Sequence, residues 1–234
     1  MNENKPTAAR SGYFTRFELC LWLGSLAAIL LSYLLSRNGE WLYLLTSLLG
    51  ATALIFVSKG NVAGQVLTVI FSLLYGFISY TYRYYGEMIT YLGMTLPIAV
   101  ASVVAWLRHP FRGRRSEVQV NRLPVWEYWG IAGAGVAVSV LFWFVLGWLH
   151  TANLFVSTVS VFTSFTAVVL SMRRSPFYAL AYGANDVVLI VLWLLASREN
   201  PSYVGMVICF GAFLVNDCYG FVNWMRMERR QRSA

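Results

Sequence analysis

The chain has 234 residues, of which 58% are hydrophobic and only 12% are charged. Soluble domains carry about 25% charged residues, so this chain has too few charges to cover the surface of a soluble domain. Its formal net charge of +8 comes from lysines and arginines in short gaps between apolar runs, which favours a basic membrane face over nucleic-acid binding. We therefore expect a protein whose main partner is the lipid bilayer.

Eight apolar runs follow one another along the chain. A membrane-spanning helix needs about 20 mostly apolar residues. The runs that meet or nearly meet this length are 17–35, 41–57, 62–82, 88–107, 126–149, 153–172, 176–197 and 202–224. Since unpaired backbone groups are not tolerated in lipid, each run is predicted to be a helix. The predicted fold class is all-α integral membrane, with about eight transmembrane helices.

The basic residues predict the orientation. If the N-terminus is cytoplasmic, only Arg37, Arg83 and Arg198 among the 18 lysines and arginines fall in outer segments. Such a bias is the positive-inside pattern of membrane proteins. The sequence therefore predicts a multi-pass protein of the plasma (inner) membrane with both termini in the cytoplasm.

The longest gap, 108–125, suggests how the helices are grouped. Three runs precede it directly, a lone run follows it, and three more complete the chain, which gives a 3+1+3 plan behind one extra helix. Two parallel triplets require an odd connecting helix, as in transporters built from parallel repeats. The predicted divisions are a cytoplasmic N-terminus (1–16), an extra helix (17–35), a first triple-helix bundle (41–107), a basic cytoplasmic linker (108–125), a connecting helix (126–149), a second triple-helix bundle (153–224) and a basic cytoplasmic tail (225–234).

Motifs of catalysis and metal binding are absent from the sequence. Cys20, Cys209 and Cys218 form no CxxC pair, and His109 and His150 lie far apart at predicted helix ends. HExxH, GxSxG and P-loop patterns do not occur. We therefore expect no enzymatic activity, no catalytic residue, no metal site, no cofactor and no built-in ATPase.

Polar residues form stripes on two predicted helices, at steps of three and four residues that place them on one helix face. The third helix carries Gln65, Thr68, Ser72, Tyr75 and Ser79, and the sixth carries Asn153, Ser157, Ser160, Ser164 and Ser171. Each stripe is compatible with helix packing through small residues or with the lining of a transport path. Gln65, Ser72 and Tyr75 are candidate cargo-binding residues.

Two acids, Asp186 and Asp217, lie well within apolar runs, and each follows an asparagine. An ionisable residue inside a membrane is expensive and marks a functional site by default, although a structural hydrogen bond is the alternative. Asp186 is predicted to share a helix face with Tyr182 and Trp193, so this face suits a flat organic cation. The candidate cargo-binding residues of these two helices are Asp186, Asn185, Tyr182, Trp193, Asn216 and Tyr219.

The chain resembles the PnuC family of vitamin transporters, best known for nicotinamide riboside uptake, from about 48 to 230. The resemblance rests on the 3+1+3 plan and on dispersed positions in 59–106 and 173–224, such as Asn185-Asp186 and Asn216-Asp217. It implies a SWEET-like fold with a midplane site between the two bundles. It also implies facilitated diffusion, a cytoplasmic kinase that traps the cargo, and a homotrimer.

The cargo stays open at this point. Nicotinamide riboside members carry a Trp-rich pattern before the acid of the seventh helix, whereas 177–184 contain no tryptophan here. Related transporters of thiamine, riboflavin or deoxynucleosides are therefore alternatives. A SWEET-like sugar transporter, an intramembrane enzyme and a non-transporting scaffold are further alternatives, and proton coupling through Asp186 or Asp217 is not decided.

Overall fold

The computed structural model describes residues 13–35, 41–81, 85–151, 153–198 and 203–234. In these residues eight helical segments are long and apolar enough to cross a membrane. The elements in chain order are α1 (Arg16–Leu35), α2 (Trp41–Ser58), α3 (Val62–Thr81), α4 (Tyr85–Ile89), the π-helix η1 (Thr90–Thr95), α5 (Leu96–Arg108), β1 (Pro110–Phe111), β2 (Arg114–Val118), α6 (Val125–Trp148), α7 (Leu154–Met172), α8 (Tyr178–Ser197) and α9 (Val204–Arg232). The expected all-α membrane fold with eight spans is confirmed.

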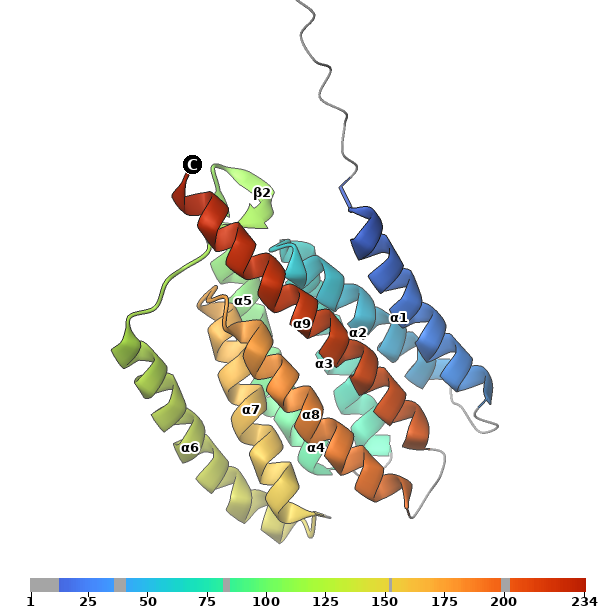
Figure 1. The fold of residues 1–234 in the computed structure, drawn as a ribbon. Helices are drawn as coiled ribbons and strands as arrows, with labels where there is room; N and C mark the ends of the chain where they lie inside the picture. The colour runs from blue at the N-terminus through green and yellow to red at the C-terminus, as the bar shows by residue number, and fades with distance from the viewer. Residues whose placement is uncertain (1–12, 36–40, 82–84, 152, 199–202) are drawn as a thin grey trace, which may run out of the picture.

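The helices form one bundle in which α1 and α6 lie at opposite edges (Figure 1). α8 packs against α7 and α9, α2 packs against α3 and α9, and α1 packs against α2 and α9. The order of α2, α3 and α4–α5, then α6, then α7 to α9 fits the expected 3+1+3 plan behind an extra helix.

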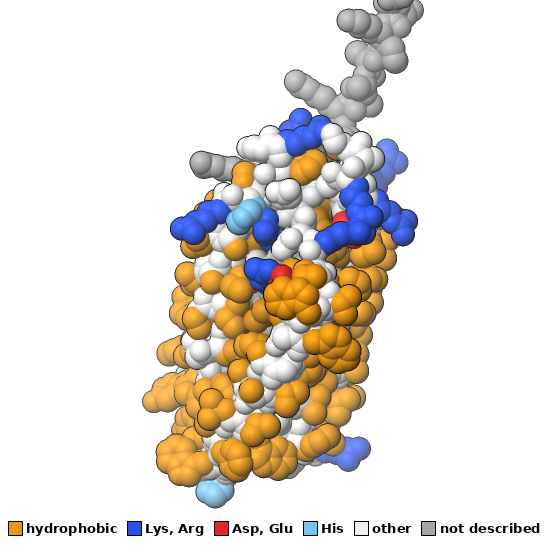
Figure 2. Space-filling view, turned by 90° about the vertical axis from the view of Figure 1, so that its left-hand side faces the viewer, with side chains coloured by type: hydrophobic (Ala, Val, Ile, Leu, Met, Phe, Trp, Pro, Cys, Tyr) orange, Lys and Arg blue, Asp and Glu red, His pale blue; other side chains and the backbone are white. Residues whose placement is uncertain are grey.

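The molecular surface has the distribution that a bilayer requires. Hydrophobic side chains cover the long face of the molecule seen in Figure 2, and lysines and arginines gather mainly at one end. That end carries the β1–β2 hairpin and the C-terminus of α9 (Figure 1). Large exposed apolar side chains are found all along the helices, and lipid tails can solvate them at little cost.

Two buried tryptophans tie the first triplet of helices to the second. Trp106 of α5 donates its indole N–H to the carbonyl of Ser171 in α7, at 2.9 Å. Trp224 of α9 donates reciprocally to the carbonyl of Val57 in α2, also at 2.9 Å. Neither indole is exposed, and the ring centroids are 5.4 Å apart. Buried tryptophan needs such a partner for its N–H, so these bonds fix the spacing of the bundles near the hairpin end.

The fourth span differs from its expected bounds of 88–107. It begins at Tyr85, and its middle is the π-helix η1 rather than a continuous α-helix. Pro97 lies in the first turn of α5 and has no N–H for the helical hydrogen-bond ladder. The wider turn before it presents Tyr91 and Thr95 to the centre of the molecule.

The segment 108–125, expected as a linker, contains the antiparallel β1–β2 hairpin. Its turn uses Arg112 at φ 51 and Gly113 at φ 74, a left-handed conformation that glycine adopts readily. The Val118 N–H bonds to the Gly60 carbonyl at 2.9 Å. The last helix was expected to end at 224, but α9 continues to Arg232. Its extra turns pack against 108–125: Met227 lies in one apolar cluster with Val118, and Glu228 forms an ion pair with Arg122.

Candidate functional site

A cavity lies in the middle of the bundle, where the two triplets meet. It leaves about 70 Å³ for the centres of water molecules. Side chains of α2, α3, η1, α7, α8 and α9 line it: Gly50, Ala53, Leu54, Val57, Gln65, Thr68, Phe71, Ser72, Tyr91, Thr95, Ser164, Tyr182, Asn185, Asp186, Phe210, Phe213 and Asp217. Nine of these seventeen residues are apolar or aromatic, and the eight polar ones converge from α3, η1, α7, α8 and α9. Such a combination is typical of small-molecule sites.

Asp186 of α8 and Asp217 of α9 are the acidic groups of the lining. Their side chains are buried, with exposed fractions of 4% and 3%. Both side chains line the same cavity. Among the described residues, Oδ2 of Asp186 has no hydrogen-bond partner. A buried carboxyl oxygen without a partner is costly, so this atom is a ready acceptor for a ligand.

Asn185 is held by the serine-rich helix α7. Its Oδ1 accepts hydrogen bonds from Thr163 at 2.8 Å, Ser164 at 2.9 Å and Ser160 at 3.4 Å. Because Oδ1 is occupied, the amide NH₂ is the part of Asn185 that can donate to a ligand. In the polar stripe of the predicted sixth helix, Ser160 therefore has a packing role, because it bonds to α8 and does not line the cavity. Ser164 bonds to α8 and also lines the cavity.

Two candidates on α3, Gln65 and Ser72, line the opposite side of the cavity. The Gln65 amide donates to Ser171 Oγ at 2.8 Å, which leaves its Oε1 as an acceptor. The Ser72 hydroxyl donates to the Thr68 carbonyl at 2.8 Å within its own helix. The hydrogen bond to Ser171 thus fixes the orientation of the Gln65 side chain. The Ser72 hydroxyl can act mainly as a hydrogen-bond acceptor for a ligand.

Aromatic rings close one end of the cavity. Phe71 stacks on Tyr75 with ring centroids 5.5 Å apart, and Tyr75 lies 4.4 Å from Tyr91 by the same measure. Phe71 also meets Phe213 of α9 edge to face at 6.1 Å. Tyr91 and Phe71 reach the cavity, whereas Tyr75 supports them from behind. Tyr182 lines the cavity on the α8 side.

Besides Tyr75, three sequence candidates lie outside the cavity lining. Trp193 packs against Tyr203, with ring centroids 5.4 Å apart. The amide of Asn216 donates to Ser25 of α1 at 2.8 Å, and the Tyr219 hydroxyl donates to Glu18 of α1 at 2.7 Å. Trp193 is also seven residues from Asp186, about 10 Å along the helix. These three side chains thus hold neighbouring helices rather than line the cavity.

Sequence reasoning missed several residues around the cavity. Tyr91 was not among the candidates, and the phenylalanines gave no signal among so many apolar residues. Glu87 was not recognised because it falls before the expected start of the fourth span at residue 88. It is 9% exposed, and its Oε2 has no partner among the described residues. Glu87 precedes Tyr91 by four residues, about one helical turn, so the fourth span carries a further buried acid near the aromatic end of the cavity.

The comparisons with known proteins agree on one kind of protein. A family model described as nicotinamide mononucleotide transporter matches residues 40–226. The nicotinamide riboside transporter PnuC of Neisseria mucosa is 26% identical over 226 residues, which cover 94% of this chain and 84% of that protein. The Haemophilus influenzae protein of the same name is 22% identical over 192 residues, or 82% of each chain. A crystal structure of the vitamin B3 transporter PnuC superposes with a TM-score of 0.81 at 25% identity, covering 94% of this chain and 95% of the other.

Proposed function

This chain belongs to the nicotinamide mononucleotide transporter family, that of the PnuC transporters, and on that premise we propose that it carries nicotinamide riboside into the cell by facilitated diffusion. It is a multi-pass membrane transporter. The matched relatives are named nicotinamide riboside transporters. The observation that carries the proposal is the unpartnered, buried carboxyl oxygen of Asp186 in an aromatic-walled cavity.

The chemistry of the cavity suits this cargo. Nicotinamide riboside is a flat pyridinium cation that carries ribose hydroxyls and a carboxamide. In this proposal the carboxylate of Asp186, whose Oδ2 has no partner among the described residues, supplies a negative charge to the cavity. This charge can balance the pyridinium, and the Tyr182 and Tyr91 rings can attract its face. Asn185 and Gln65 can then bind the hydroxyls or the carboxamide.

Facilitated diffusion moves a cargo only down its concentration gradient. Continued uptake therefore requires that the free cargo be removed inside the cell. The sequence has no P-loop, so no built-in ATPase is expected to drive the cargo against its gradient. A cytoplasmic kinase that phosphorylates the nucleoside would trap it, because the added charge opposes return through an acidic cavity. The resemblance to PnuC transporters supports this coupling and a homotrimeric assembly.

We also propose the membrane topology. The basic end of the molecule faces the cytoplasm of the inner membrane, together with both termini (1–16 and 225–234) and the segment 108–125 (Figure 2). Cargo then binds between the bundles 41–107 and 153–224, with 126–149 as the connecting helix.

Counterflow in proteoliposomes tests the proposed function. Vesicles loaded with unlabelled nicotinamide riboside should accumulate labelled nicotinamide riboside transiently, without any ion gradient and with no effect of a proton ionophore. Unlabelled thiamine, riboflavin and deoxynucleosides are the competitors. Accumulation that requires a proton gradient would refute facilitated diffusion. Labelled thiamine that exchanges when nicotinamide riboside does not would instead assign the site to the other cationic vitamin.

A further inference from the structure

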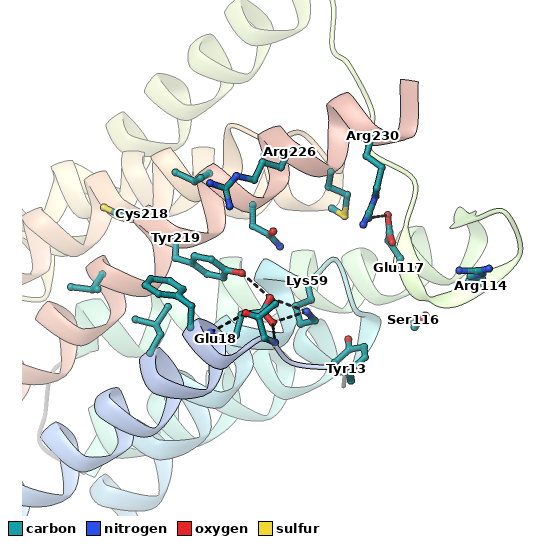
Figure 3. Close-up of a pocket in the computed structure, with 17 residues that line it drawn as sticks. Tyr13, Glu18, Lys59, Arg114, Ser116, Glu117, Cys218, Tyr219, Arg226 and Arg230 are labelled. Carbon is teal, nitrogen blue, oxygen red and sulfur yellow. Dashed lines mark hydrogen bonds and ion pairs between the residues drawn. The ribbon is translucent and has the colours of Figure 1, made fainter. Parts of the chain in front are cut away.

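A second, larger hollow lies at the basic end of the molecule, separate from the cargo cavity. It is a groove of about 1200 Å³ between α1, α9 and β2 (Figure 3). α1 contributes Phe17 and Glu18, α9 contributes Val222, Arg226 and Arg230, and β2 contributes Arg114. Nothing in the transport chemistry described above uses this groove.

The floor of the groove is a closed, neutral network. Glu18 Oε1 is 2.8 Å from Lys59 Nζ and 2.7 Å from the hydroxyl of Tyr219. The Thr15 N–H donates to the same carboxylate at 2.6 Å, while the Thr15 hydroxyl accepts from the Glu18 N–H at 3.2 Å, which is a capping box at the start of α1. Burial raises the pKa of the Tyr13 hydroxyl at the edge of the groove, so that group adds no negative charge.

The walls of the groove carry a positive excess. Arg230 is paired with Glu117 at 2.6 Å, and Lys59 is paired with Glu18. Among the described residues, Arg226 and Arg114 have no ion pair, although both line the groove. Figure 3 shows Arg226 beside the floor network and Arg114 farther out on the hairpin. An unpaired guanidinium group such as that of Arg226 can bind a phosphate ester bidentately, and Arg114 adds positive charge at the hairpin end of the groove.

The other half of the groove is apolar. Phe17, Val215 and Val222 line it, with exposed fractions of 62%, 56% and 44%. All three lie in the membrane-spanning parts of α1 and α9. The same hollow therefore offers cations at its basic end and an apolar surface along the two helices. A soluble phosphate ester would use only the first half, whereas a phospholipid would use both.

We propose that this groove binds an anionic phospholipid of the cytoplasmic leaflet, with its phosphate at Arg226, in the positive potential that Arg114 adds from the hairpin, and its acyl chains along Phe17, Val215 and Val222. The proposal rests on the orientation proposed above, in which the basic end faces the cytoplasm. Basic pockets between helices on the cytoplasmic side are suited to anionic headgroups. Bound there, the lipid bridges α1 to α9 and to the hairpin.

Native mass spectrometry of the full chain with phosphatidylglycerol tests the site. Each arginine removed from the groove is expected to weaken phosphatidylglycerol binding about fivefold, which corresponds to about 1 kcal/mol per basic residue. The double variant Arg114→Gln/Arg226→Gln should therefore lose most of its bound phosphatidylglycerol. The matched control Arg108→Gln/Arg229→Gln removes two exposed arginines of the same end that do not line the groove, and it should bind as the wild type does. Equal loss in both double variants would refute the groove as the site.

Two further arms identify the source of the phosphate. Phosphatidylcholine should bind more weakly than phosphatidylglycerol, and soluble glycerol phosphate should not displace the lipid at equal concentration. Displacement by glycerol phosphate would refute the lipid proposal, because the site would then take a free anion. Val222→Gln, which alters only the apolar half, should weaken lipid binding too. Thermal shifts with nicotinamide riboside should persist in all these variants, so failure here and failure of the proposed function are distinguishable.

Discussion

At the residue scale, the two Asn-Asp pairs show how far one sequence signal reaches. Asn185 and Asp186 both line the cavity, but of the second pair only Asp217 does, because Asn216 turns toward α1. A functional role of the two acids could be predicted, because an ionisable side chain is costly to place inside a membrane. The direction in which the Asn216 side chain points could not be predicted. Lipid tails are as apolar as the protein interior, so a membrane helix shows no clear amphipathic pattern.

The replacement Asn185→Leu tests how the cavity is held together. It removes the acceptor of Ser160 and Ser164 and the donor facing the cavity. We expect a loss of about 1–3 kcal/mol in unfolding free energy and weaker cargo binding. Thermal unfolding and titration with nicotinamide riboside measure the two effects. Ser139→Ala is the control, because within the described residues that hydroxyl bonds only to the Gly135 carbonyl of its own helix. Unchanged binding in Asn185→Leu would exclude the amide as a cargo donor.

At the element scale, the apolar runs were enough to predict the eight spans, because length and apolarity alone decide what crosses a bilayer. The β1–β2 hairpin was missed, since β1 has two residues, β2 has five of which two are arginine, and tertiary contacts with α9 stabilise the hairpin. The π-helix η1 was missed as well. It depends on how the chain relaxes before Pro97, which no periodicity encodes. Because η1 was not predicted, the sequence did not identify Tyr91 as a residue of the cavity.

The contact between α2 and α3 depends on Gly64. A Cβ at this position would lie 2.4 Å from the backbone nitrogen of Val57, which cannot move aside as a side chain can. Gly64→Ala should therefore force the two helices apart and cost about 1–3 kcal/mol in unfolding free energy. Gly130→Ala in α6 is the control, since a Cβ there meets nothing within 4 Å. Equal melting temperatures of the two variants would contradict this packing.

At the scale of the whole molecule, the cavity is smaller than its proposed cargo. One water centre needs about 10–15 Å³, so the 70 Å³ available admits only a few waters. Drug-sized ligands occupy pockets of about 300–1,000 Å³. Cargo binding must therefore move side chains or helices around the cavity, and the aromatic end formed by Phe71, Tyr91 and Phe213 is the part that such a movement has to open.

The orientation is tested by labelling single cysteines in intact cells. In a background with Cys20 and Cys218 replaced by serine, His150→Cys and Ser233→Cys place one thiol near each end of the molecule. A membrane-impermeant maleimide should label position 150 from outside and position 233 only after permeabilisation, as the basic end predicts. The reverse pattern would invert the proposed topology and with it the leaflet of the lipid groove.

The measurement that tests the central claim most directly is titration of the wild type and Asp186→Asn with nicotinamide riboside. The variant keeps the shape of the side chain but removes the charge at the unpartnered oxygen. A hydrogen bond to a charged group is worth about 1.5–3 kcal/mol, so affinity should fall about tenfold or more. Glu127→Gln, which removes a surface acid paired with Arg173, should bind normally. A well-folded Asp186→Asn with unchanged affinity would contradict the assignment of Asp186 as the ligand of the cation.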